Sequence, residues 1–175
     1  PWQMGFHGTR AHLNDLLHIT PSLWAVLNVR QDLHCEVMLG QYTPFALTAL
    51  ENTSTPEPLP WHSFRHYQAS KRLHIGLAPL LQTPFNEGKS FIKFLDIAAM
   101  GGVGIYSNRY PYTEVVRHGE NGLLVGDTPG EWRAALQQLL NNPEATANMA
   151  QQAAADALRV GALHHAVDFW QARQR

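Results

Sequence analysis

The feature that most constrains the fold of this chain is an apolar run that leads through a turn into a helix. Residues 73–81 are mostly apolar, as in a buried strand, and a turn follows at residues 83–88. Apolar residues then recur at the spacing of one helical face: Phe91, Ile92, Leu95, Ala98 and Ala99. A strand, a turn and a helix in this order predict one unit of a parallel α/β sheet.

The same order of elements recurs along the chain. Strands are expected at Trp2–Phe6, His34–Leu39, Trp61–Tyr67, Ile75–Leu81, Val103–Ser107 and Gly122–Val125. Helices are expected at Ala11–Leu27 with a bend or a restart at Pro21, then at 68–73, 89–99, 112–118, 129–141, 143–158 and 163–170. The proline-rich segment 51–60 is expected to be a surface loop. The pattern predicts a single α/β domain of three layers with a parallel sheet.

Composition narrows the function classes. A formal net charge of -1 gives no overall attraction to nucleic acid or to an anionic membrane. No apolar stretch approaches the roughly 20 residues that span a bilayer. The single cysteine, Cys35, lies in an apolar run and is expected to be a buried free thiol, which suits a reducing compartment. The ten histidines do not cluster at metal-ligand spacing, so no metal is expected. We interpret the chain as a piece of a larger protein.

The turn before residue 89 predicts an anion site. The free N–H groups at a helix start and the helix dipole both attract phosphate, and we expect the helix to open at Lys89 and Ser90. Lys89, Lys93 and Asp96 lie about one helical turn apart and are expected to share a face. Two lysines suit a phosphate and a carboxylate suits a ribose diol. The competing interpretation is a surface helix in which Asp96 pairs with Lys93.

The turn after the first strand is a second candidate. Gly8, Thr9 and Arg10 follow Trp2–Phe6 closely, and a glycine there permits close approach of a phosphate. Thr9 is also a plausible N-cap for the next helix. His12 and Asp15 are one helical turn apart, so they form either a charge-tuned pair or, as we favour, a solvated helix face.

Two runs of sequence resemble a known family. The runs "APLLQTPFNEGKSFIKFLDIAAMGGVGIYSN" and "YTEVVRHGENGLLVGDTPGEW" resemble the C-terminal, donor-binding half of a group 1 glycosyltransferase of GT-B fold. Order and spacing agree over residues 61–150, and "GFHGTRAHLNDLLHITPSLWAVL" is similar to the first phosphate turn and helix. The resemblance implies a Rossmann-like, nucleotide-sugar-binding domain at residues 1–160. Residues 161–175 would then be a C-terminal helix of the kind that crosses to the missing N-terminal domain.

The resemblance also implies residue roles. Asp96 occupies the second position of the family's two-carboxylate motif, which binds the ribose hydroxyls. The first position, which holds a carboxylate in the family, falls on Gly88. Glu87 would supply this carboxylate if the loop shifts by one residue. The family's lysine after the first strand is missing, and Lys89 and Lys93 are expected to compensate. The implied donor-binding residues are Gly8, Thr9, Arg10, Glu87, Gly88, Lys89, Ser90, Phe91, Lys93 and Asp96. Lys89 and Arg10 would stabilise the departing diphosphate.

The implied activity is glycosyl transfer from an NDP-sugar, a substrate and not a cofactor, to a hydroxyl acceptor. The acceptor would be a glycan or a lipid-linked glycan in polysaccharide biosynthesis, bound through the missing N-terminal domain, with no metal, no nucleic acid and no transmembrane segment. This fragment would be catalytically incomplete, and its catalytic residues stay unassigned. We expect a cytoplasmic protein, peripheral to the inner face of the membrane at full length. Two alternatives stay open: the half-domain of an NDP-sugar 2-epimerase, and a non-catalytic α/β scaffold.

Overall fold

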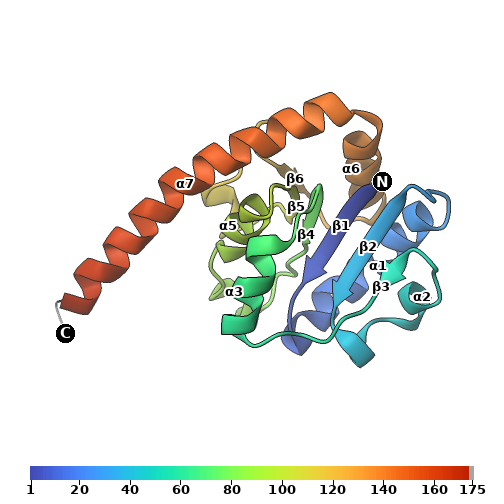
Figure 1. Cartoon of the computed structure of the whole chain (residues 1–175), viewed down its shortest axis with the longest axis horizontal. Helices are drawn as coiled ribbons and strands as arrows, with labels where there is room; N and C mark the ends of the chain where they lie inside the picture. Colours follow the sequence, from blue (N-terminus) through green and yellow to red (C-terminus); the bar gives the residue numbers. More distant parts are fainter. Residues whose placement is uncertain (174–175) are drawn as a thin grey trace.

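The computed structural model describes residues 1–173, with side chains up to residue 162. One sheet of six parallel strands, in the order β3-β2-β1-β4-β5-β6, forms the centre of the molecule (Figure 1). The strands are β1 (Trp2–His7), β2 (Leu33–Met38), β3 (Thr53–Ser54), β4 (Ile75–Ala78), β5 (Val103–Ser107) and β6 (Leu123–Val125). The expected Rossmann-like α/β fold with a parallel sheet is therefore confirmed.

Helices cover both faces of this sheet. The α-helices are α1 (Leu13–Leu27), α2 (Phe45–Thr48), α3 (Trp61–Ser70), α4 (Pro84–Glu87), α5 (Ile92–Ala99), α6 (Pro129–Asn141) and α7 (Pro143–Arg173). Short 3-10 helices are η1 (Arg10–His12), η2 (Gly40–Tyr42) and η3 (Tyr112–Glu114). The larger apolar core joins the strands to α1 and α6, and a second core joins them to α5 and α7. The result is the three-layer arrangement that the sequence predicts.

The strand order reverses between β1 and β4. From β1 the chain moves outward to β2 and β3, then crosses back to β4 on the other side of β1. The loops that follow β1 and β4 therefore leave the sheet in opposite directions. In open parallel sheets this reversal leaves a crevice at the carboxyl ends of the strands, where ligands bind.

The predicted strand at Trp61–Tyr67 is wrong, because these residues begin helix α3. The large aromatic residues Trp61, Phe64 and Tyr67 favour a strand by their type, but they recur every three residues, which is the spacing of a helix face. Phe64 and Tyr67 are half-buried and Gln68 is buried, whereas the rest of α3 is exposed or nearly so. The expected loop at 51–60 also needs a correction, because β3 pairs with β2 there.

The predicted helix start at Lys89 and Ser90 is also wrong. Thr83 Oγ1 accepts a hydrogen bond from the Asn86 N–H at 3.1 Å and caps the separate short helix α4, with Pro84 at its first position. Helix α5 begins only at Ile92. Thr-Pro is a helix-start signal in its own right, so the chain starts one helix at residue 84 and another after the Gly88 turn.

The C-terminal helices merge. Residues 143–158 and 163–170 were expected as separate helices, but α7 is continuous from Pro143 to Arg173 and its last part extends beyond the rest of the molecule (Figure 1). Alanine-rich sequence favours a helix, and the cost of about 1 kcal/mol for Gly161 does not interrupt it. The proposed division at residue 160 falls inside α7 and stays a prediction. Residues 174–175 lie outside the described residues.

Two smaller expectations change as well. Helix α1 continues through Pro21 without a restart, and the Thr20 hydroxyl donates to the Leu16 carbonyl at 2.8 Å beside it. The helix expected at 112–118 is only the single turn η3. The capped start of α6 is confirmed, since Thr128 and Glu131 form a capping box.

The close packing of α5 against β4 gives the first prediction. A Cβ atom at Gly76 would lie 2.4 Å from Ile97 Cγ1, so only glycine lets α5 pack this close to the strand. We expect Gly76→Ala to lower the free energy of unfolding by about 1–3 kcal/mol, measured by urea denaturation. The control is Gly130→Ala in α6, where a Cβ meets nothing within 4 Å. Equal stability of the two variants would contradict this packing.

Candidate functional site

A cavity of about 230 Å³ lies at the carboxyl edge of the sheet, beside the reversal of strand order. The ends of β1 and β2, the turn after β1, the start of α3 and the first turns of α5 surround it. The lining residues are His7, Gly8, Thr9, Met38, Leu59, Trp61, Phe64, Lys93 and Asp96. Part of this lining is apolar and aromatic, and the rest includes an imidazole, an ammonium and a carboxylate.

Asp96 is a buried carboxylate on α5. Its side chain accepts a hydrogen bond from Gln68 Nε2 at 3.0 Å, and the guanidinium of Arg65 lies 3.6 Å from the same oxygen, Oδ1. Both partners come from α3, so this helix fixes the orientation of the carboxylate. Asp96 is therefore not the exposed helix acid of the competing interpretation.

Lys93 is half-buried and lines the same cavity as Asp96. Burial lowers the pKa of its ammonium group, an effect that Asp96 opposes and that Lys89 reinforces. The carboxylate of Asp96 already has Arg65 as its ion-pair partner. A partly desolvated cation thus faces the cavity, which favours an anion there.

Of the three candidate residues in the turn after β1, the structure places two in the lining of the cavity. Gly8 and Thr9 line the cavity, and a Cβ at Gly8 would lie 3.0 Å from the ring of Phe6 and 3.4 Å from the Cβ of His12. A side chain at position 8 would therefore crowd this turn. Arg10 is exposed, and its guanidinium lies 4.8 Å from the ring centre of Tyr42. Arg10 is outside the cavity lining.

The loop between α4 and α5 also lies outside that lining. The ammonium of Lys89 is 4.1 Å from the ring centre of Phe85, and Ser90 Oγ accepts from the Ile92 N–H at 3.4 Å. Gly88 is exposed, and Phe91 packs against the second core. Glu87 lines a separate hollow of about 280 Å³ between the loops after β4 and β5. The ligand roles of these residues stay predictions.

Asp15 is a site-forming residue that the sequence analysis placed wrongly on a solvated face. Its carboxylate is 3% exposed, and Oδ1 accepts from the Leu81 N–H at 2.8 Å and from Asn86 Nδ2 at 3.0 Å. The other oxygen, Oδ2, pairs with His12 Nδ1 at 3.3 Å. One carboxylate of α1 therefore fastens the turn after β1 to the loop after β4.

A second buried network was missed entirely. His7 Nε2 lies 2.9 Å from Glu36 Oε1, and the Tyr67 hydroxyl donates to the same oxygen. Lys71 Nζ lies 3.2 Å from Oε2. Burial would raise the pKa of the Glu36 carboxyl, but the bonds from His7 and Tyr67 and the charge of Lys71 together lower it to about 2. The available signal was a glutamate inside the apolar run of β2.

Gly5 makes room for this network. It pairs with Glu36 across β1 and β2, and a Cβ at position 5 would lie 3.1 Å from His7 Nε2. Because Gly5 has no side chain, the imidazole of His7 can lie over the strand and reach the neighbouring carboxylate. The ring also contacts Phe64 and Tyr67 edge-on, which ties α3 to the end of β1.

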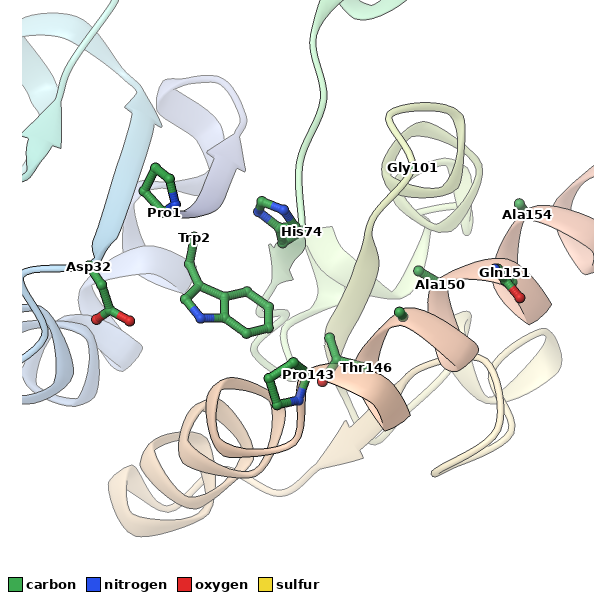
Figure 2. Close-up of a pocket in the computed structure, with 11 residues that line it drawn as sticks. Pro1, Trp2, Asp32, His74, Gly101, Pro143, Thr146, Ala150, Gln151 and Ala154 are labelled. Carbon is green, nitrogen blue, oxygen red and sulfur yellow. The ribbon is translucent and has the colours of Figure 1, made fainter.

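A larger cavity, about 720 Å³, lies at the opposite edge of the sheet, at the amino ends of β1 and β4 (Figure 2). Trp2 of β1 and His74, just before β4, face it from one side, and Thr146 and Ala150 face it from α7. His74 Nδ1 is already used as the acceptor for the Gln3 N–H at 2.9 Å. Parallel sheets bind ligands at the other edge, so we do not assign the site here.

No helix within residues 1–173 is both long and apolar enough to cross a membrane. In the same part of the chain, no three His, Cys, Asp or Glu side chains are grouped so that they could hold a metal ion.

Comparisons with known proteins identify the fold. No family model and no curated protein matches the sequence. The C-terminal domain of a group 1 glycosyltransferase, LpcC from Francisella tularensis, superposes with a TM-score of 0.68 at 13% identity, covering 90% of this chain and 85% of that one. HepE from Anabaena in complex with UDP-glucose gives 0.69 at 12% identity, covering 90% and 44%.

A structure from another enzyme class is equally similar. A putative UDP-N-acetylglucosamine 2-epimerase from Listeria monocytogenes gives a TM-score of 0.65 at 15% identity, covering 91% of this chain and 43% of that one. The chain thus spans less than half the length of the epimerase and of HepE. At these identities the likeness shows the fold alone, which is that of the C-terminal domain of a group 1 glycosyltransferase, as the sequence resemblance implies.

The Glu36 network gives a prediction on pH dependence. The pKa of Glu36 in the folded protein is lowered from 4.5 to about 2. The network therefore stabilises the folded state above pH 4.5, and this stabilisation is lost as the pH falls toward 2. This loss amounts to about 3 kcal/mol of unfolding free energy. We expect Glu36→Gln to be less stable at neutral pH and to show a flatter pH dependence in urea denaturation, with Tyr67→Phe intermediate. Parallel pH curves for Glu36→Gln and the wild type would refute this role.

Proposed function

We propose that this chain is the donor-binding domain of a glycosyltransferase of GT-B fold. It binds an NDP-sugar whose glycosyl group is transferred to the hydroxyl of an acceptor. The observation that carries the proposal is the cavity at the strand-order reversal, where Lys93 and Asp96 of α5 meet the glycine turn at Gly8 and Thr9. A cation, a carboxylate and a close backbone approach at one place are the groups that a nucleoside diphosphate requires.

The nucleoside would occupy the apolar side of the cavity. Met38, Leu59, Trp61 and Phe64 offer a flat, partly aromatic wall to a base. Asp96 would accept hydrogen bonds from the ribose hydroxyls, because an ionised carboxylate is an acceptor only. Gln68 and Arg65 hold one of its oxygens in place, which keeps the carboxylate in a single orientation for the sugar.

The diphosphate would lie between the turn after β1 and α5. Gly8 permits a close approach, and the partly desolvated ammonium of Lys93 gains a counter-charge when the diphosphate binds. Lys89 and Arg10 would add positive charge at the rim, once they leave the rings of Phe85 and Tyr42. These cations would stabilise the diphosphate as it departs, in a mechanism that needs no metal. Acceptor binding, and any base that activates the acceptor, would come from the N-terminal half of such an enzyme.

The two alternatives predict different results. The Listeria structure supports the half-domain of an NDP-sugar 2-epimerase, which would also bind the nucleotide, so only turnover by the two-domain protein separates it from a transferase. A non-catalytic scaffold need not bind any nucleotide. Titration of the chain with UDP, GDP and ADP therefore separates the scaffold from both enzymes.

The first binding prediction concerns Asp96. We expect Asp96→Asn to weaken the preferred nucleoside diphosphate about tenfold in calorimetric titration, because the amide no longer accepts from both ribose hydroxyls. The 2′-deoxy form of the same nucleotide should lose much less on this substitution. The matched control is Asp32→Asn, an exposed aspartate at the other edge of the sheet. Wild-type affinity in Asp96→Asn would overturn this role.

The second binding prediction concerns the contact between Lys93 and the diphosphate. We expect Lys93→Met to weaken the nucleoside diphosphate about tenfold and to leave the affinity for the bare nucleoside nearly unchanged, because the ammonium contacts only phosphate. Lys89→Met should show the same selectivity with a smaller loss, since Lys89 lies outside the cavity lining. If Lys93→Met weakened nucleoside and diphosphate equally, the proposed position of the diphosphate would be wrong.

A further inference from the structure

The exposed face of helix α3 carries two histidines that the cavity does not use. His62 and His66 are four residues apart, both are exposed, and their ring centres lie 5.0 Å apart. The inner face of α3 is half-buried or buried and carries Phe64, Tyr67 and Gln68. Neither histidine lines the cavity at the carboxyl edge of the sheet. The pair therefore lies apart from the proposed nucleotide site.

The helical conformation of residues 61–70 is what brings the two imidazoles together. In the strand expected for residues 61–67, His62 and His66 would lie about 13 Å apart. Four residues of an α-helix rise only about 6 Å and return to the same face. Two histidines at this spacing on one helix face are zinc ligands in the H-E-x-x-H motif. The expectation that the histidines do not cluster rested on a strand at 61–67, and α3 replaces that strand.

The ring nitrogens of this pair are free to bind a ligand. Among the described residues, neither His62 nor His66 has a hydrogen-bond or ion-pair partner, and each contacts the other ring edge-on. The guanidinium of Arg65 is engaged elsewhere, by Gln68 at 2.9 Å and by the ring of Trp61. Five other imidazoles, in contrast, each make a hydrogen bond: His7, His12, His34, His74 and His118.

The separation of the rings matches two imidazoles on one metal ion. An imidazole nitrogen binds zinc at about 2.1 Å, which places the ring centre about 3.2 Å from the ion. At the angles of square-planar and tetrahedral sites, two such ring centres lie roughly 4.5–5.2 Å apart. The observed 5.0 Å falls in this range. Both side chains are exposed, so core packing does not oppose a rotation of either ring toward a shared ion.

We propose that His62 and His66 form a two-imidazole site for a divalent transition-metal ion of the late first row, namely Cu²⁺, Ni²⁺ or Zn²⁺. Imidazole suits these ions, whereas Mg²⁺ and Ca²⁺ prefer oxygen ligands. A closed structural site needs four side chains, and no group of three suitable ones occurs among the described residues. The site is therefore open, with water in the remaining coordination positions, and its ion is exchangeable.

A bound ion would stabilise α3. Both ligands belong to this one helix, so the ion prefers the folded helix to the unfolded chain and shifts the equilibrium toward it. The same helix carries Arg65 and Gln68, which hold the Asp96 carboxylate. The ion would reinforce the helix that orients this carboxylate without entering the cavity.

The experiment is calorimetric titration of the chain with the chlorides of Cu²⁺, Ni²⁺, Zn²⁺ and Mg²⁺ in a buffer that does not chelate metals. We expect a saturable isotherm that is tightest for Cu²⁺ and absent for Mg²⁺. His62→Gln and His66→Gln, each of which keeps the other nine histidines, should both lose this isotherm. In urea denaturation, Ni²⁺ should raise the midpoint of the wild type and leave the midpoints of both variants unchanged.

Two double variants with equal numbers of histidines are the matched controls, both at exposed positions of α3. His62→Gln with Ser70→His restores two histidines four residues apart, at positions 66 and 70, and should recover binding. His66→Gln with Ala69→His leaves two histidines seven residues apart, which is about 10 Å along the helix. This second variant should not recover binding.

Three outcomes would overturn the metal site. The first is a wild type that shows no saturable binding of Cu²⁺ or Ni²⁺, and the second is binding that survives His62→Gln. The third is equal binding by the two double variants, because the spacing on the helix would then be irrelevant. None of these outcomes bears on the nucleotide cavity, whose failure is measured separately by titration with UDP, GDP and ADP.

Discussion

The close packing of helix α5 against strand β4 is the contact on which the candidate site depends. Ile97 covers Gly76 at a distance that leaves no room for a side chain on the strand. This fixes how far α5 lies above the sheet, and Lys93 and Asp96 lie in the first and second turns of the same short helix. The reversal of strand order opens a crevice, but the depth of α5 decides which side chains reach it.

Buried carboxylates organise the surroundings of this crevice. Glu36, Asp15 and Asp96 come from β2, α1 and α5. Glu36 and Asp96 accept hydrogen bonds from α3, and Asp15 accepts one from the loop after β4. A buried carboxylate is tolerated only when donors or cations surround it, so each one fixes its partners in place. Together they connect α3 to the ends of β1 and β2, the loop after β4 to α1, and α5 to α3.

The sequence predicted the sheet well because buried parallel strands are continuous apolar runs and helix caps are local signals. Val103–Ser107 and the Thr128 cap are examples, since each depends on neighbouring residues only. Two predictions, the helix start at residue 89 and the strand at 61–67, were wrong because two local patterns compete in each segment. The partners that surround Asp15 and Glu36 could not be read from local sequence, because all of them except His12 lie between 29 and 71 residues away along the chain.

The Asp15 carboxylate has a consequence for the thermodynamics of ligand capture. It joins the turn after β1 to the loop after β4 through bonds to His12, Leu81 and Asn86, all of them in place without a ligand. Segments that are already immobile lose little conformational entropy when a ligand arrives, so more of the contact energy remains as affinity. The buried acid of α1 therefore makes the crevice between these two loops a preorganised one.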